Sequence, residues 1–273
     1  MKQATHRLPA LYIPHGGGPC FFMDPPPNAP HLWDGMAAYL RGIAASVGTR
    51  PKAILVISAH WEAVRPTVNS GAQPGMLFDY YGFPEHTYRL AYPAPGSPVL
   101  AARVRSLLGH AGIPADEDAT RGYDHGVFVP FLLMYPDADV PVVQLSLQAG
   151  LDPAAHLAIG RALAPLRDEG VLIVGSGMSY HNLRAFFAPD PQVMQGSERF
   201  DAALTRAVEA VDPAARDAQL VAWKQLPDAL VCHPRAEHLL PLMVAAGAGA
   251  ADQGRRTYND RVFGKAVSAF QFG

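Results

Sequence analysis

The stretch Ile54-Leu55-Val56-Ile57-Ser58-Ala59-His60-Trp61-Glu62 decides the fold class that we predict. Its run of branched aliphatic residues is typical of a strand buried on both faces, as in a parallel sheet. The run stops at two small residues, which are followed by a histidine and a tryptophan. Because ligands of open α/β sheets bind beyond the carboxyl ends of the strands, we expect His60 to lie where such a sheet places its chemistry.

Strands and helices alternate along most of the chain. Apolar runs predict buried strands at residues 8–14, 140–147 and 171–174, and the tail at 262–273 is compatible with another strand. Helical spacing and capping residues predict helices at 32–47, 97–109, 153–167, 198–210, 214–224 and 237–246. We therefore predict an α/β fold, with a central mostly parallel or mixed sheet flanked by helices, in a single domain over residues 1–273. Residues 62–96 lack clear periodicity and are expected to form a long loop over the rim of the sheet.

Composition excludes several classes of function. The chain has 273 residues, of which 49% are hydrophobic and 17% charged, with a formal net charge of -2. It has no run of basic residues for nucleic acid and no apolar stretch of about 20 residues to cross a membrane. No signal peptide is evident at the N-terminus, so we expect a cytoplasmic protein. Its two cysteines, Cys20 and Cys232, give neither a disulfide framework nor a paired-cysteine metal motif.

Histidines stand at several of the predicted strand ends. His15 and His181 follow the strands at 8–14 and 171–174, as His60 follows its own strand. His125 lies beside a glycine, and His238 precedes a helix. A single buried histidine is ordinarily a hydrogen-bonded core residue, but several at one sheet edge would each need a separate buried partner. One shared divalent metal at the carboxyl edge of the strands would satisfy them together.

The residue types leave the identity of the metal open. Imidazole combined with a carboxylate or water suits Zn, Fe, Cu or Ni, and a set with open positions is typical of catalytic sites. Glu237 or Glu62 could supply a carboxylate. We expect the histidines at 6, 31, 110 and 156 to be solvated, and we keep His86 and His233 as weaker candidates near the site.

A set of short motifs along the chain resembles one family. In order, these are Pro14-His15-Gly16-Gly17, Ser58-Ala59-His60-Trp61, Gly82-Phe83-Pro84, Tyr92-Pro93-Ala94-Pro95-Gly96-Ser97-Pro98, Asp124-His125-Gly126, Tyr135-Pro136-Asp137-Ala138-Asp139-Val140-Pro141, Gln144-Leu145-Ser146, His181-Asn182-Leu183 and Glu237-His238-Leu239-Leu240-Pro241-Leu242. The chain thereby resembles class III extradiol ring-cleavage dioxygenases of the DOPA 4,5-dioxygenase type. The resemblance covers almost the whole chain.

The resemblance implies roles for particular residues. His15, His60, His181 and His238 match the metal-binding positions, and His125 and His181 match positions of acid–base chemistry. In other relatives the metal triad is two histidines and a glutamate, which leaves the roles of His181, Glu237 and His238 open. The chain departs from many relatives at His15-Gly16-Gly17-Gly18-Pro19, where they have His-Gly-Ser-Pro.

The resemblance also implies an activity, which is the opening of a catechol-type, DOPA-like ring with O₂ at a non-haem metal. Fe(II) is the metal expected for activity and Zn(II) is the alternative. The expected partners are a small aromatic substrate and O₂, with no nucleic acid and no membrane, in a monomer or small homo-oligomer. Trp61, Tyr80 and Phe83 could clasp the aromatic ring. A zinc hydrolase and a non-catalytic metal-binding or ligand-binding relative are the competing hypotheses.

Overall fold

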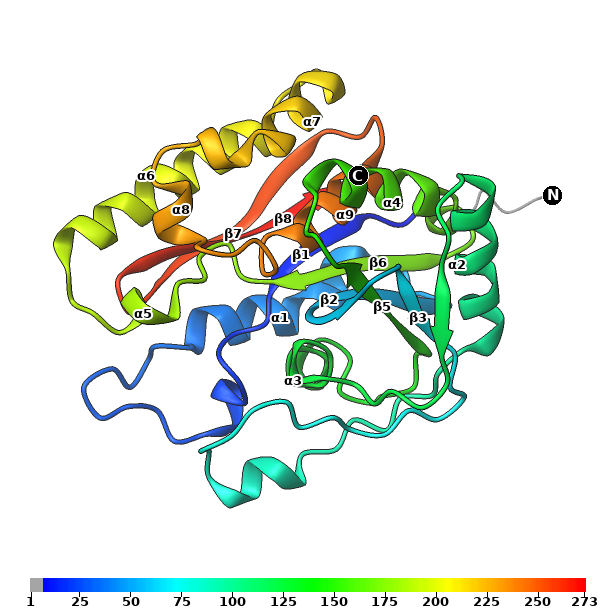
Figure 1. Cartoon of the computed structure of the whole chain (residues 1–273). Coiled ribbons are helices and arrows are strands. Elements are labelled where there is room, and N and C mark those ends of the chain that lie inside the picture. Colours follow the sequence, from blue (N-terminus) through cyan, green and yellow to red (C-terminus); the bar gives the residue numbers. More distant parts are fainter. Residues whose placement is uncertain (1–6) are drawn as a thin grey trace.

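The computed structural model describes residues 7–273, and its strands there form one eight-stranded sheet with the order β4-β3-β5-β2-β6-β1-β8-β7 (Figure 1). The strands are β1 (Ala10–Pro14), β2 (Ala53–Ala63), β3 (Thr67–Asn69), β4 (Asp116–Asp118), β5 (Val142–Gln148), β6 (Val171–Gly177), β7 (Gly254–Val262) and β8 (Lys265–Phe272). The four central strands β5, β2, β6 and β1 are parallel, whereas β3 and β8 run antiparallel to their inner neighbours. The predicted mixed α/β fold is confirmed.

Helices cover both faces of the sheet. The longer ones are α1 (Asp34–Val47), α2 (Pro98–His110), α3 (His125–Met134), α4 (Pro153–Leu163), α6 (Pro191–Val208), α7 (Pro213–Val221) and α9 (Leu240–Gly249). The two short ones are α5 (Leu183–Phe186) and α8 (Ala229–Cys232). Helix α9 packs on the central strands with α4 behind it, while α3 and α1 lie on the opposite side of the sheet (Figure 1). The branched apolar residues of the central strands are therefore buried from both sides.

Most predicted elements are present, with shifted ends. The helix predicted at 97–109 is α2, and the Ser97 side chain caps it by accepting a hydrogen bond from the Leu100 backbone nitrogen at 3.2 Å. The helix predicted at 153–167 ends at Leu163 and continues as a 3₁₀ turn, Ala164–Arg167. The long loop at 62–96 contains β3 and a second 3₁₀ turn, Glu85–Arg89.

Two further strands escaped the sequence analysis, β7 and β4. Both are rich in charged residues and partly exposed, so neither shows a continuous apolar run. Within residues 7–273, no helix has the length and apolar character needed to cross a bilayer. The cytoplasmic location and the single domain stay predictions.

Candidate metal centre and aromatic pocket

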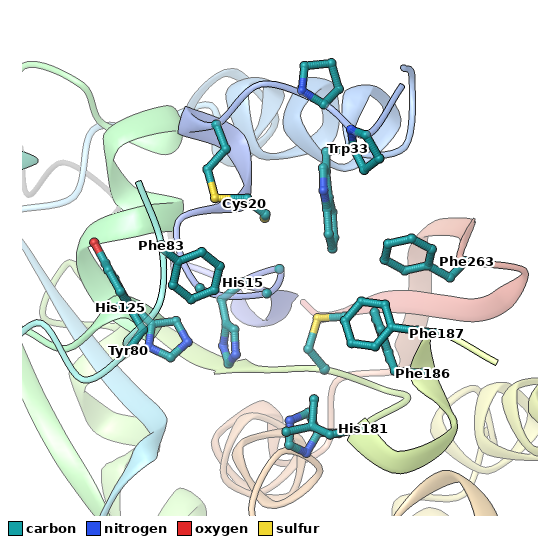
Figure 2. A pocket seen from close by; sticks show the side chains of 18 of the residues that line it. His15, Cys20, Trp33, Tyr80, Phe83, His125, His181, Phe186, Phe187 and Phe263 are labelled. Atoms are coloured by element: carbon teal, nitrogen blue, oxygen red, sulfur yellow. The ribbon is translucent and has the colours of Figure 1, made fainter. Parts of the chain in front are cut away.

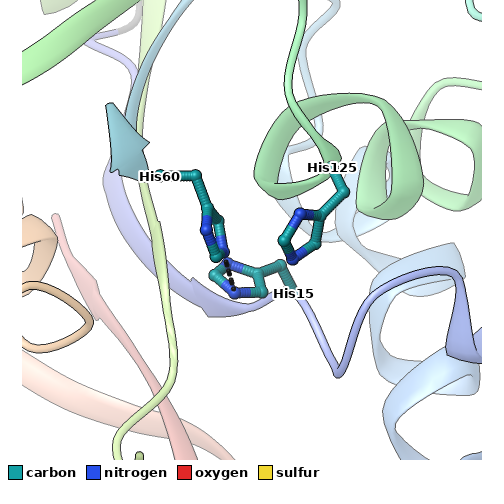
Figure 3. Close-up of side chains that lie close together, drawn as sticks. All are labelled: His15, His60 and His125. Carbon is teal, nitrogen blue, oxygen red and sulfur yellow. Dashed lines mark hydrogen bonds between the residues drawn. The ribbon is translucent and has the colours of Figure 1, made fainter. Parts of the chain in front are cut away.

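Five histidines from distant segments of residues 7–273 line one cavity of about 670 Å³. They are His15, His60, His125, His181 and His238. The Nε2 atoms of His15 and His60 are 3.1 Å apart, and the ring of His125 lies beside them with its centre 3.8 Å from that of His60 (Figure 3). The ring centre of His238 lies 5.2 Å from that of His15 and 4.8 Å from that of His60. The sequence analysis named all five.

Adjacent strands bring these residues together. His15 directly follows β1, and its backbone nitrogen donates to the Gly177 carbonyl at the end of β6 (3.1 Å). On the other side of β6, the pairing with β2 ends at Ser58, so His60 extends beyond that ladder. The order β2-β6-β1 therefore places two histidines at the carboxyl edge of neighbouring parallel strands, as expected from the topology.

The backbone of His238 is fixed against the same edge. Its carbonyl accepts hydrogen bonds from the Tyr12 hydroxyl at 2.7 Å and from the Met178 backbone nitrogen at 3.1 Å. A side chain at Gly177 would overlap this carbonyl, so the absence of a Cβ allows β6 and the segment before α9 to approach. Gly126 has a similar role, because a Cβ there would press on Ser58 and His60.

The hydrogen bonds of His15 fix its tautomer. Its Nδ1 lies 3.1 Å from the Ser176 hydroxyl oxygen. That hydroxyl donates its own hydrogen to the Gly126 carbonyl, so its oxygen must accept from His15 Nδ1. The Nε2 atom of His15 is then unprotonated, and its lone pair is available on the side of His60.

Two carboxylates orient the other four imidazoles. Asp79 Oδ1 accepts from His125 Nδ1 at 2.8 Å, and Asp79 Oδ2 lies 3.6 Å from His60 Nδ1. Glu237 Oε1 lies 3.0 Å from the Nδ1 of His238 and 3.2 Å from that of His181. Partners of this kind fix the orientation of metal-ligating histidines and raise their basicity.

Burial keeps three of these imidazoles neutral. It lowers the pKa of His15 and of His238 well below the ordinary value, and neighbouring imidazoles lower it further. Burial and the nearby ring of His125 likewise lower the pKa of His60. A histidine must be neutral to bind a metal, so these side chains are in the required form at neutral pH.

The two carboxylates, in contrast, stay ionised. Burial is the largest single effect on Asp79 and acts to raise its pKa, but the two hydrogen bonds from His125 and the electrostatic effects of the His125 and His60 rings together outweigh it, so the pKa lies below its ordinary value. For Glu237, burial is again the largest single effect. It is outweighed by the hydrogen bond with His181, a backbone hydrogen bond and the electrostatic effects of His181 and Arg235 together, so the pKa of Glu237 is also lowered. Two negative charges therefore lie behind the imidazoles.

The donor set fits a divalent metal. Two nitrogens that each lie about 2 Å from one ion, at roughly a right angle, are ~3 Å apart, which is the separation of the Nε2 atoms of His15 and His60. Without an ion or a proton between them, two lone pairs at this distance repel. Cys20 also lines the cavity, but burial raises the pKa of its thiol to about 12, so it contributes no thiolate at neutral pH.

Comparisons with known proteins agree with this geometry. Residues 9–269 match the family model described as the catalytic LigB subunit of aromatic ring-opening dioxygenase. The chain belongs to this LigB family. It is an extradiol ring-cleaving dioxygenase, and enzymes of this family use a metal.

Relatives of this dioxygenase occur in fungi, plants and bacteria. It is 38% identical to the dioxygenase tasH of Hapsidospora irregularis over 281 aligned positions. This alignment covers 97% of this chain and 85% of that protein. A 4,5-DOPA dioxygenase extradiol of Beta vulgaris is 44% identical over 205 positions, 73% of this chain and 74% of that protein. A crystal structure of an uncharacterized protein from Escherichia coli K12 matches with a TM-score of 0.75 and 30% identity, over 98% of this chain and 100% of that chain.

Several weaker candidates lie outside the pocket of this LigB-family dioxygenase. Glu62 is bound by both terminal nitrogens of Arg235, each at 2.6 Å. His233 is fully buried with its Nε2 bonded to the Ser179 carbonyl at 2.9 Å. His86 bonds a carbonyl on the exposed surface and does not line the cavity.

Two expectations were wrong. His156 was expected to be solvated, but it is fully buried, because α4 packs beneath α9 and its Nε2 accepts a hydrogen bond from the Gln148 backbone nitrogen at 3.2 Å. Trp61 does not reach the pocket, since it is buried with the Arg121 guanidinium stacked 4.5 Å from its ring centre. His31 and His110 are exposed as expected, and His6 lies outside the described residues.

Sequence reasoning also missed residues of the dioxygenase pocket. Asp79 lies in the stretch 62–96, which was expected to be a loop over the rim and in which no role was assigned to it, although a carboxylate among aromatic residues is a signal for a buried hydrogen-bonding group. Trp33, Phe187 and Phe263 line the cavity and come from the start of α1, the end of α5 and the turn between β7 and β8. Tyr80, which was expected there, lines the cavity too.

Proposed function

We propose that this dioxygenase opens a catechol-type ring with O₂ at a divalent metal held by the Nε2 atoms of His15, His60 and His238, with Fe(II) as the working metal. The observation that carries the proposal is the 3.1 Å approach of the Nε2 atoms of His15 and His60 in a pocket shared with His125 and His181. When bound, the metal supplies the point at which the two catechol oxygens and O₂ are brought together.

The stacking of His181 on His238 divides the roles of this pair. Their ring centres are 3.3 Å apart and their planes are only 15° from parallel. An imidazole binds a metal in its own ring plane, so two stacked parallel rings do not point at the same ion. The ring of His238 contacts those of His15 and His60, which favours it as the ligand. We therefore reduce the four-histidine set implied by the resemblance to three and assign His181 to proton transfer.

His125 is the proposed base for the catechol hydroxyl. Its Nδ1 is bonded to ionised Asp79, which leaves Nε2 to accept a proton from the substrate. The charge of Asp79, at 2.8 Å, then stabilises the imidazolium. His181 with Glu237 forms a second pair of the same kind at 3.2 Å, suited to assist or to return a proton.

Several relatives are named for DOPA, which contains a catechol ring, and this supports a catechol ring as the group that this chain opens. The family match favours this activity over the zinc hydrolase and the non-catalytic scaffold that the histidines alone allowed.

The test is anaerobic mixing of Fe(II)-loaded protein with a catechol, followed by admission of O₂. A yellow ring-fission product and O₂ uptake are expected, and protein loaded with Zn(II) instead should give neither. His238→Ala should lose bound metal, whereas His125→Ala should keep its metal and lose turnover. Full turnover by His125→Ala, or unchanged metal content in His238→Ala, would contradict the assigned roles.

A further inference from the structure

One wall of the cavity is aromatic and apolar. Figure 2 shows Trp33, Phe187 and Phe263 across the cavity from His125. The ring centre of Phe263 lies 6.4 Å from that of Trp33, 5.0 Å from that of Phe187 and 5.6 Å from that of Phe186, so the four rings form a continuous surface. We call these four residues the aromatic wall.

Phe263, which contacts the other three rings of the aromatic wall, lies on an unusual turn. Phe263 and Gly264 join β7 to β8 with φ angles of 48° and 78°. Tight hairpin turns of this kind ordinarily take glycine, asparagine or aspartate at both positions, because a bulky side chain is strained at positive φ. The chain nevertheless has phenylalanine at the tip, where the side chain lines the cavity. Backbone strain of this kind is typical of functional sites.

The aromatic wall continues to the mouth of the cavity and into solvent. Phe187 is 69% exposed and Leu183, which also lines the cavity, is 65% exposed. Large apolar side chains exposed together beside a pocket are typical of ligand-binding grooves. On the opposite side, Tyr80 presents its ring and not its hydroxyl, because the hydroxyl donates to the Thr87 carbonyl at 2.8 Å.

Charges that could bind an anionic substituent are missing from the part of the lining that the structure describes. That lining contains no lysine or arginine, and its single carboxylate, Asp24, is exposed at the rim. Arg184 and Arg235 line a neighbouring hollow that shares His181 with the cavity, and Arg235 is occupied there by Glu62 and Glu237. An unpaired carboxylate in an apolar site is strongly disfavoured.

We propose that the substrate is a catechol with an uncharged, apolar alkyl or aryl substituent, which packs against the aromatic wall of Trp33, Phe186, Phe187 and Phe263 while its two hydroxyls face the histidines. This inference rests on the proposed function for the reaction itself. It gives the cavity an occupant larger than catechol, consistent with a volume of about 670 Å³. Amino-acid catechols such as DOPA are then poor substrates of this chain.

The decisive experiment compares two substrates that differ in one charged group, 4-propylcatechol and 3-(3,4-dihydroxyphenyl)propionate. We expect kcat/KM for O₂ uptake by Fe(II)-loaded protein to be at least tenfold higher for 4-propylcatechol. From 4-methylcatechol to 4-propylcatechol it should rise about fourfold per methylene, which corresponds to about 0.8 kcal/mol per buried methylene. Equal or higher kcat/KM for the propionate, for L-DOPA or for dopamine would overturn the proposal.

A binding measurement separates this inference from the proposed activity. Equilibrium dialysis with metal-free protein should show the same preference for 4-propylcatechol over the propionate. If no catechol consumes O₂ but the binding preference is present, the proposed activity fails and the substrate class stands. If binding shows no preference, the substrate class fails whatever the activity.

A variant tests whether the aromatic wall sets the preference. Phe187→Arg places a cation at an exposed position of the wall, and we expect it to lower the propylcatechol-to-propionate ratio of kcat/KM at least tenfold. Val211→Arg is the matched control, because Val211 is 82% exposed and does not line the cavity. An unchanged ratio in Phe187→Arg would place the substituent elsewhere and overturn the assignment.

Discussion

Replacing Asp79 with asparagine removes one charge from behind the metal centre and changes little else. The Asp79 carboxylate accepts from the His125 side chain at 2.8 Å and from the His125 backbone nitrogen at 3.0 Å. An asparagine oxygen can accept the same two hydrogen bonds, so the loop should keep its shape. What is lost is the charge that stabilises the His125 imidazolium formed when the catechol is deprotonated. Hydrogen bonds to charged groups contribute about 1.5–3 kcal/mol, which predicts a loss in kcat of roughly 10-fold to 100-fold for Asp79→Asn.

The assay is O₂ uptake at saturating catechol, with metal content measured on the same sample. Asp79 also lies 3.6 Å from His60 Nδ1, so metal affinity is expected to fall modestly, and kcat must be compared at full metal loading. Asp139→Asn is the matched control, because Asp139 forms an exposed ion pair with Arg50 at 2.5 Å and should leave kcat unchanged. Wild-type kcat in fully loaded Asp79→Asn would refute the assignment of His125 as the base.

Three further outcomes follow from the geometry. Gly177→Ala should lower the unfolding free energy measured in urea by about 1–3 kcal/mol and weaken metal binding, because the added Cβ would overlap the His238 carbonyl. Gly42→Ala is the control and should not lower the unfolding free energy, because a Cβ at this position of α1 has no neighbouring atom within 4 Å. Zn(II) at 100 times its dissociation constant should raise the unfolding free energy of chelator-treated protein by about 2.7 kcal/mol, and no shift would exclude a metal site in the folded state. Burial lowers the pKa of His156, so as pH falls below about 6.5 the unfolded chain takes up a proton before the folded chain does, and the unfolding free energy decreases. Between pH 7 and pH 5, the unfolding free energy of His156→Gln should therefore decrease by up to about 2 kcal/mol less than that of the wild type, and an equal decrease would contradict this.

The parallel core of the fold was predictable because each central strand carries its own signal. The apolar runs of β2, β5 and β6 are buried on both faces, so their sequences are apolar throughout, whatever the neighbouring elements do. The edge strands β4 and β7 have no such signal. Their residues are partly exposed, and β7 is a strand because β8 pairs with it along most of its length.

The histidines were predictable for a related reason. Parallel strands end at one edge of a sheet, so histidines placed at the ends of separate strands are expected to meet there. His15 and His60 do meet, and their Nε2 atoms are 3.1 Å apart. The roles of the five histidines did not follow from this argument, because a role depends on the direction of each ring and not on its place in the sequence.

The direction of each histidine ring is set by hydrogen-bonding partners that cannot be identified from the sequence, because most of them lie far from the histidine along the chain or in a segment without a recognisable pattern. Ser176 fixes the tautomer of His15 from the neighbouring strand, and Asp79 reaches His125 from a loop without periodicity. Glu237 was weighed as a metal ligand because it is an acid beside His238, yet its oxygen lies on the Nδ1 side of two imidazoles.

These anchors separate the hypotheses that the histidines alone left open. Histidines with only a packing role would need one hydrogen bond each, and Nδ1 already supplies it for His15, His125 and His238. The Nδ1 atoms of the other two, His60 and His181, lie 3.6 Å and 3.2 Å from a carboxylate oxygen. The Nε2 atoms are then not needed for packing, and those of His15 and His60 face each other at 3.1 Å across the cavity. An arrangement that anchors the rings on their Nδ1 side and brings the Nε2 atoms of His15 and His60 to 3.1 Å is accounted for by an ion between them and a substrate in the same cavity. The same reasoning predicts that replacing an anchor, unlike replacing a ligand, should lower turnover more than it lowers metal content.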